Sequence, residues 1–303
     1  MHSQLTTAPS TAVGIPASTE LHPGHVPVGP LVLGAWLRTE RCAGGIRLRT
    51  SAATIGRTVR DLRDIEAGMA PAAPGEIYTL LQLYGSGADQ HHALTAIAHV
   101  LHDGTEPHDQ LADLCQGWPS RLFQLIWQAS RVRAAANCVV PLGLRSPLYG
   151  ATVAEQIIGV AEDDLPLLTH PIPASRLTAQ PWTVVLGEAI AIRYFLPGLD
   201  AQLDHLLHLS ETGAVDLRVA TGPAHPSAEL LELVLPGPPV VTVVAEVTRR
   251  GVLYRAGPHG AAGELSRLID SARAGAASPE ASRILLRRSY AALAIAALAA
   301  AVS

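Results

Sequence analysis

The chain has 303 residues, of which 48% are hydrophobic, so it can bury a large core and is not disordered as a whole. Its 22 basic residues are all arginines against 26 acids, and the formal net charge of −4 is not typical of a nucleic-acid binder, although a local basic patch can still bind DNA. The three cysteines, Cys42, Cys115 and Cys138, have no metal-binding spacing, which excludes a zinc framework and predicts buried free thiols.

Residues 1–30 are rich in Pro, Ser, Thr and Gly and contain no Arg or Lys. They show no apolar periodicity, which predicts a flexible arm without side chains that could bind phosphate. They also lack the basic and apolar regions of a signal peptide, so we expect a cytoplasmic protein.

Residues 31–105 predict a compact domain of five short helices, because apolar residues recur at helical spacing between glycine stops. Thr58 is placed to cap the third helix. The expected helices are 32–42, 48–55, 59–67, 76–84 and 89–102.

The second and third of these helices, separated by Gly56, have the spacing of a helix-turn-helix, in which the second helix enters the major groove of DNA. The segment resembles the helix-turn-helix domain of Xre-type regulators. The matching positions are Leu33-Gly34-Ala35, Leu37-Arg38, Gly45, Ala52, Gly56, Ile65-Glu66, Gly68, Pro74 and 81–85.

The later chain resembles the large C-terminal domain of unknown function that follows this module in many actinobacterial proteins. The matching positions are 129–133, Val140-Pro141, Leu186, Glu188-Ala189, Leu203, 205–207, Ala224-His225-Pro226, Ser278-Pro279-Glu280 and Ser282-Arg283.

The resemblance implies that Arg57, Thr58, Arg60 and Arg63 contact DNA. Several positions depart from the family pattern in ways that weaken this expectation. Acids stand at Asp61 and Asp64 of the recognition helix, and residues 33–85 hold seven Arg against five acids, a net charge of only +2. Other departures are Arg47, Leu48 and Arg49 at the start of the second helix, Ser51 at a buried leucine position, and Met69-Ala70-Pro71 in place of a basic cluster.

Residues 106–303 predict a helical part followed by a small α+β part, so the expected fold is mainly α with an α+β C-terminal part. Residues 109–136 are expected to form two helices, and 163–180 a loop-rich connector. Five β-branched runs then predict a sheet of about five strands covered by helices on one face. These runs are 181–186, 215–220, 230–235, 240–247 and 252–255, with helices expected at 199–210, 260–273 and 279–302.

The last helix has a clear start, with Ser278 as cap, Pro279 at its first position and Glu280 in its first turn. Its final twelve residues, 291–302, are apolar on all sides and too short to span a bilayer, for which about 20 residues are needed. They must be covered by their own domain or by another chain. We therefore expect a homodimer and no membrane contact.

Several residues of the later domain are candidates for binding a small apolar metabolite or a small protein partner. By the resemblance, Ala135 and Ala136 replace a Tyr-Glu pair, and the loss of two bulky polar groups would enlarge any cavity that they line. The other candidates are Arg131, Glu188, Arg193, Tyr194 and His225.

Two functions fit these patterns. The first is an Xre-like transcriptional regulator with a weakened DNA-binding surface and a C-terminal domain that receives a signal. The second is a family member that has lost DNA binding and binds or converts a small molecule in natural-product biosynthesis, for example as a shape-driven cyclase. The sequence contains no recognised catalytic motif, and neither a cofactor nor a metal is expected.

Overall fold

The computed structural model describes residues 27–104, 109–158, 172–192, 196–221, 228–237, 240–257 and 259–302. The candidate residues Arg193, Tyr194 and His225, and nearly all of the expected arm, lie outside these ranges. Within them, no helix is both long and apolar enough to cross a bilayer.

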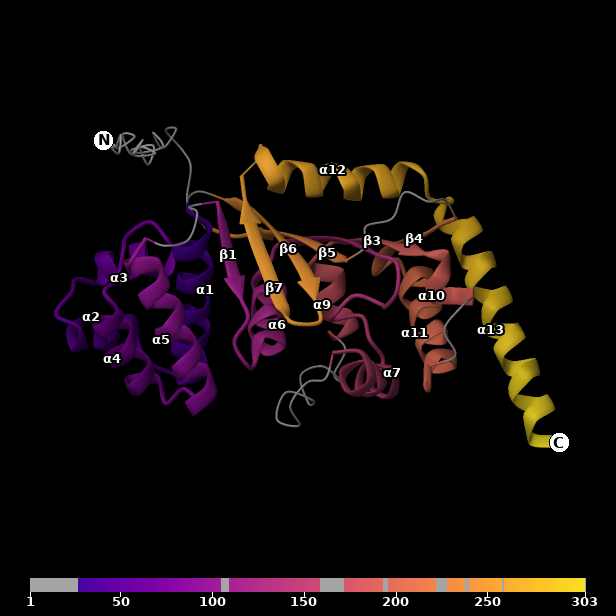
Figure 1. Ribbon diagram of the computed structural model, residues 1–303, viewed down its shortest axis with the longest axis horizontal. Coiled ribbons are helices and arrows are strands. Elements are labelled where there is room, and N and C mark those ends of the chain that lie inside the picture. Colours follow the sequence, from indigo (N-terminus) through magenta and orange to yellow (C-terminus); the bar gives the residue numbers. More distant parts are fainter. Residues whose placement is uncertain are drawn as a thin grey trace, which may run out of the picture.

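The N-terminal part consists of five helices, as the sequence predicts. They are α1 (Val28–Ala43), α2 (Leu48–Thr54), α3 (Val59–Glu66), α4 (Pro74–Tyr84) and α5 (Ala88–His102). The first helix begins four residues earlier than expected, inside the segment assigned to the arm, and Val28 and Val32 are fully buried. Figure 1 shows these helices as one group at one end of the molecule.

The remaining part is α+β. Its strands are β1 (Gln110–Asp113), β2 (Arg131–Ala136), β3 (Trp182–Gly187), β4 (Val215–Ala220), β5 (Glu229–Leu235), β6 (Val241–Thr248) and β7 (Gly251–Ala256). Its helices are α6 (Trp118–Gln128), α7 (Pro147–Val153), α9 (Ala174–Ala179), α10 (Glu188–Ile192), α11 (Leu199–Glu211), α12 (Gly260–Ala274) and α13 (Pro279–Val302), and a π-helical turn, η1 (Ala154–Ile158), follows α7.

The seven strands form one mixed sheet in the order β1-β7-β6-β5-β2-β3-β4. Strands β2, β3 and β4 are parallel, and β5, β6, β7 and β1 continue the sheet from β2 with antiparallel pairing. The connections between the parallel strands contain helices, as parallel pairing requires.

The expectation of two helices over 109–136 is wrong in part, because α6 lies between two strands. Strand β2 has the sequence Arg-Val-Arg-Ala-Ala-Ala, whose alanines favour a helix. In the fold this segment pairs with β3 on one side and β5 on the other, so tertiary pairing overrides local propensity. The sheet therefore has seven strands instead of about five.

The expectation that helices cover only one face of the sheet is also wrong. Of the helices that the structure describes, α12 alone lies across one face, and the others lie on the opposite side or beside the sheet (Figure 1). Beneath α12 is a small apolar cluster that contains Ala135, Val185, Leu230 and Ile269. The larger core fills the opposite side and continues into α1, so the N-terminal helices and the sheet share one core.

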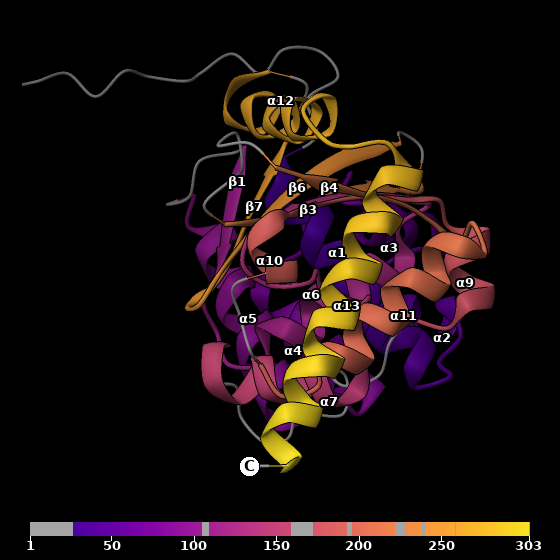
Figure 2. The ribbon, with the colours of Figure 1, turned by 90° about the vertical axis from the view of Figure 1, so that its right-hand side faces the viewer.

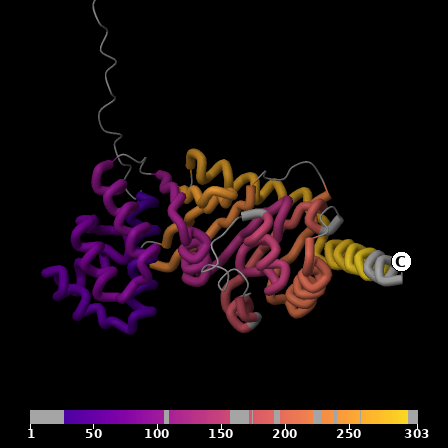
Figure 3. Tube along the Cα trace, turned by 60° about the horizontal axis from the view of Figure 1, so that its bottom comes forward, coloured from indigo at the N-terminus to yellow at the C-terminus, as the bar shows by residue number. Residues whose placement is uncertain are grey.

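The last helix begins as predicted, because the backbone N–H of Ala281 donates to the hydroxyl of Ser278 over 3.2 Å. Helix α13 crosses beside β4 and α11 and ends at the far side of the molecule from α2 and α3 (Figures 2 and 3). Its outer side exposes Ile284, Tyr290 and Ile295.

The prediction of buried cysteines is wrong. Cys42 and Cys138 are exposed and Cys115 is half-buried, and all three are free thiols. Cys42 lies in the last turn of α1 and Cys138 just after β2, where each chain segment leaves the core.

Candidate functional site

The helices α2 and α3 are joined by a tight turn that ends in a well-formed helix cap. The hydroxyl of Thr58 accepts from the backbone N–H of Asp61 at 3.1 Å, and the Asp61 carboxylate accepts from the N–H of Thr58 at 2.9 Å. These two bonds form a capping box, which satisfies two N–H groups at the start of α3. The bond from the Thr58 N–H is the main cause that holds the pKa of the Asp61 carboxyl below its usual value.

Helix α3 is fixed against α1 by a close backbone approach. A Cβ on Gly34 would lie 2.4 Å from the carbonyl oxygen of Ile65, so only glycine allows the two helices to approach this far. Arg41 of α1 donates to both carboxylate oxygens of Glu66, at 2.6 and 2.9 Å. Such a bidentate pair has a defined geometry, so α3 has one orientation on α1.

The outer side of α3 carries Arg60 and Arg63, two of the three arginines that the resemblance assigns to DNA contact. The side chain of Arg60 is 91% exposed and lies 4.0 Å from Asp64, a weak surface contact. Arg63 is exposed and has no ionic partner among the described residues. Thr58 is exposed too, although its hydroxyl is occupied by the cap.

Arg57 is not free. Its guanidinium donates to both oxygens of Glu76 in α4, at 2.7 and 3.2 Å. Glu76 also accepts from the backbone N–H of Ala73 at 2.8 Å, and the Arg57 guanidinium is the main cause of the lowered pKa of this carboxyl. Arg57 can therefore reach a phosphate only by leaving Glu76.

Arg47 and Arg49 extend the same charged surface onto the start of α2. Both side chains are exposed, and within the described ranges neither guanidinium has a partner. Sequence reasoning treated these residues only as departures from the family pattern. Their position at the start of α2 could have identified them. This is the first helix of the expected helix-turn-helix, and the first helix of such a motif crosses the DNA backbone.

The unusual Ser51 is buried, as expected for a core position of this module. Its hydroxyl donates to the carbonyl of Arg47 at 3.4 Å, and it lies near Tyr84. Burial raises the pKa of Tyr84 to about 12, so this phenol stays neutral beside the neighbouring apolar residues.

Among the candidate residues of the later domain that the structure describes, Arg131 lies far from Glu188, and Ala135 and Ala136 lie in different layers. Arg131 begins β2, whereas Glu188 follows the end of the parallel neighbour β3, so the two lie at opposite ends of these adjacent strands. In the register of the pair, Arg131 is level with Pro181, so about seven residues of strand separate it from Glu188, a distance of roughly 23 Å. Ala135 and Ala136 are buried on opposite faces, because Ala135 packs beneath α12 and Ala136 packs in the large core.

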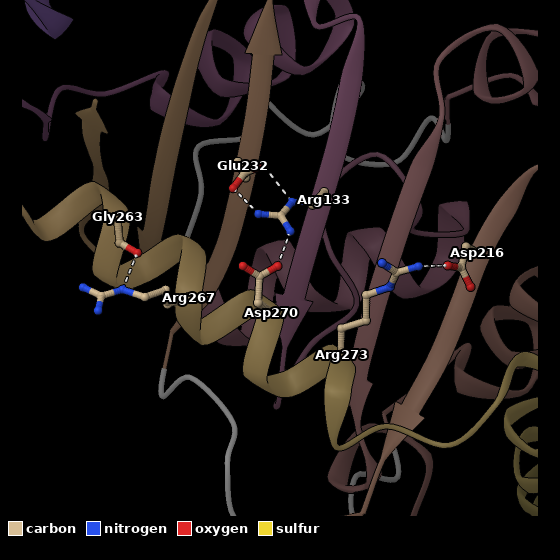
Figure 4. Close-up of polar contacts among 7 residues, drawn as sticks. All are labelled: Arg133, Asp216, Glu232, Gly263, Arg267, Asp270 and Arg273. Atoms are coloured by element: carbon tan, nitrogen blue, oxygen red, sulfur yellow. Dashed lines mark hydrogen bonds and ion pairs between the residues drawn. The ribbon is translucent and has the colours of Figure 1, made fainter. Parts of the chain in front are cut away.

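The sheet face under α12 is held by ion pairs (Figure 4). Arg133 of β2 donates to Glu232 of β5 at 2.7 Å and also contacts Asp270 of α12. Arg273 of α12 donates to Asp216 of β4 at 3.1 Å. These arginines are neutralised by neighbouring acids, so the contacts attach α12 to the sheet.

A second buried polar cluster, around Glu229 at the start of β5, also has a structural role. The sequence did not indicate it. Arg145 donates to the carbonyl of Val140 at 2.7 Å and to Glu229 at 3.1 Å, and Glu229 accepts from the N–H of Leu142 at 2.9 Å. Burial raises the pKa of Glu229. The partners are 84 residues apart, and no local pattern links them.

Comparison with known proteins gives one match. The family model described as a domain of unknown function, DUF5753, matches residues 120–288, more than half of the chain. The match begins in α6 and therefore does not include the five N-terminal helices. No curated protein and no solved structure matches the chain significantly.

Proposed function

The chain belongs to the DUF5753 family, and from that premise we propose that it is a DNA-binding regulator of the Xre type, in which α2 and α3 form the helix-turn-helix. In this proposal α3 is the recognition helix. The DUF5753 domain would receive a signal from a small molecule or a small protein partner, and the chain would act in the cytoplasm as a homodimer.

One observation carries the proposal. A capped, rigidly packed α3 and the start of α2 present exposed guanidinium groups on one side, and those of Arg47, Arg49 and Arg63 have no partner among the described residues. Arginines supply the phosphate contacts that give most non-specific affinity for DNA. The acids of α3 do not cancel this charge fully, because residues 47–64 hold five arginines and only two aspartates.

The small-molecule alternative has less support. It depended on an interior enlarged by alanine at positions 135 and 136, and the two side chains point into different layers of the fold. Arg131 and Glu188, two of its proposed polar groups, lie at opposite ends of the adjacent strands β2 and β3.

The proposal is tested by measuring binding to duplex DNA with fluorescence anisotropy. We expect that Arg49→Gln and Arg63→Gln each weaken binding several-fold at low salt, because each removes about one phosphate contact. The matched control is Arg267→Gln on α12, where an exposed arginine donates to the carbonyl of Gly263 in its own helix. Equal losses for all three variants would contradict the proposed surface and indicate a general charge effect.

A further inference from the structure

A buried arginine lies where the N-terminal helices meet the DUF5753 domain. Arg121 of α6 and Asp113 of β1 are both 0% exposed, and the guanidinium donates to the two carboxylate oxygens at 2.8 and 2.7 Å. Arg121 also donates to the carbonyl of Cys115 at 3.0 Å and to the side-chain oxygen of Gln90 in α5 at 3.1 Å. One guanidinium therefore connects β1 and α6 with a helix of the N-terminal module.

Gln90 continues this chain of contacts to α1. Its amide nitrogen donates to Glu40 at 3.2 Å, while its amide oxygen accepts from Arg121. Glu40 also accepts from Ser86 at 2.7 Å and from Gln124 of α6 at 3.2 Å. The polar chain thus runs from Asp113 through Arg121 and Gln90 to Glu40.

Trp36 of α1 packs against the same arginine. Its indole N–H donates to the backbone carbonyl of Arg121 at 3.0 Å, and the guanidinium lies 5.9 Å from the centre of the indole ring. The indole ring also meets Tyr254 of β7 edge-on, with 5.8 Å between the ring centres. Trp36 is fully buried in the core that α1 shares with the sheet.

Apolar packing and polar contacts constrain this junction differently. Apolar surfaces attract without direction, so a purely apolar junction allows neighbouring orientations of similar energy. A buried ion pair has one good geometry, and any other arrangement leaves a charge without its partner. The polar chain therefore selects one orientation from those that the apolar core would permit.

We propose that Arg121 is a positioning residue that holds the helices α1–α5 in a single orientation on the DUF5753 domain. Glu40 and Gln90 extend its action to α1 and α5, and Gly34 with the Arg41–Glu66 pair extends it to α3. The inference rests on the proposed function in one respect, namely that the surface held in place is the DNA-binding one. In a dimer, the distance between two recognition helices would then be set by the DUF5753 domains.

The test is hydrogen exchange, followed by mass spectrometry, on the full chain without DNA. The variant is Asp113→Leu with Arg121→Met, which replaces the ion pair by apolar side chains and leaves no buried charge unpaired. The control replaces the other buried pair, as Glu229→Leu with Arg145→Met, which lies within the DUF5753 domain.

We expect amides of α1 and α5 in the first variant to exchange at least tenfold faster than in the parent chain, with β2 and β5 unchanged. In the control variant, α1 and α5 should keep the exchange rates of the parent. The inference is overturned if exchange in α1 and α5 is unchanged, or if it increases by the same factor as exchange in the sheet.

A milder variant keeps the test decisive if the double variant does not fold. Gln90→Met removes the hydrogen bonds that link Arg121 to Glu40 through Gln90. We expect amide exchange to become at least threefold faster, and only in α1 and α5. No increase with Gln90→Met would overturn the inference. These readouts do not involve DNA, so a parent chain that fails to bind DNA would contradict the proposed function and leave the positioning role standing.

Discussion

At the scale of single residues, the ion pair between Arg57 and Glu76 decides whether Arg57 is available to contact a DNA phosphate. We predict that Glu76→Gln strengthens DNA binding about two- to five-fold, because the exposed ion pair with Glu76 no longer competes with phosphate for Arg57. Glutamine can still accept from the N–H of Ala73, so α4 keeps its cap. Anisotropy at fixed salt measures the change. Glu264→Gln on α12 carries the same change of charge, and an equal gain there would refute the specific effect.

The sequence assigns Arg57, Thr58, Arg60 and Arg63 to DNA contact through a resemblance; all four are exposed, and the contact itself stays a prediction. It could not reveal the partner of Arg57, because Glu76 belongs to another helix 19 residues further on. Such pairings depend on how helices pack, which local spacing does not encode.

At the scale of elements, the capping box decides how firmly α3 is held. We predict that Thr58→Ala lowers the free energy of unfolding by about 1 kcal/mol, because one N–H at the start of α3 loses its acceptor. Urea unfolding measures this change. The control is Thr79→Ala within α4, where the hydroxyl bonds only to the carbonyl of Gly75 and alanine favours the helix. A loss as large in the control would contradict a special role for the cap.

The elements with strong local signals were predictable. Glycine stops and Thr58 located the N-terminal helices, and Ser278 with Pro279 located the start of α13. Strands β1 and β2 were not predictable, because one is a four-residue edge strand and the other is rich in alanine. Their strand conformation comes from pairing with β7, β5 and β3, which are distant in sequence.

At the scale of the whole molecule, the proposed DNA-binding surface belongs to a protein whose negative net charge opposes binding to DNA. The chain has a net charge of −4, whereas residues 47–64 hold five arginines and two aspartates. Long-range attraction to DNA is therefore weak, and affinity must come from contacts made at close range. About four phosphate contacts, from Arg47, Arg49, Arg60 and Arg63, would give a slope of roughly −3.6 for log K against log salt.

The measurement that tests the central proposal most directly is a salt series of DNA binding by the parent chain. Fluorescence anisotropy with a genomic duplex library, from low to moderate salt, should show binding that weakens on the order of 100-fold between about 50 and 200 mM salt. Absence of binding at the lowest salt, or binding that does not change with salt, would contradict DNA recognition by α2 and α3.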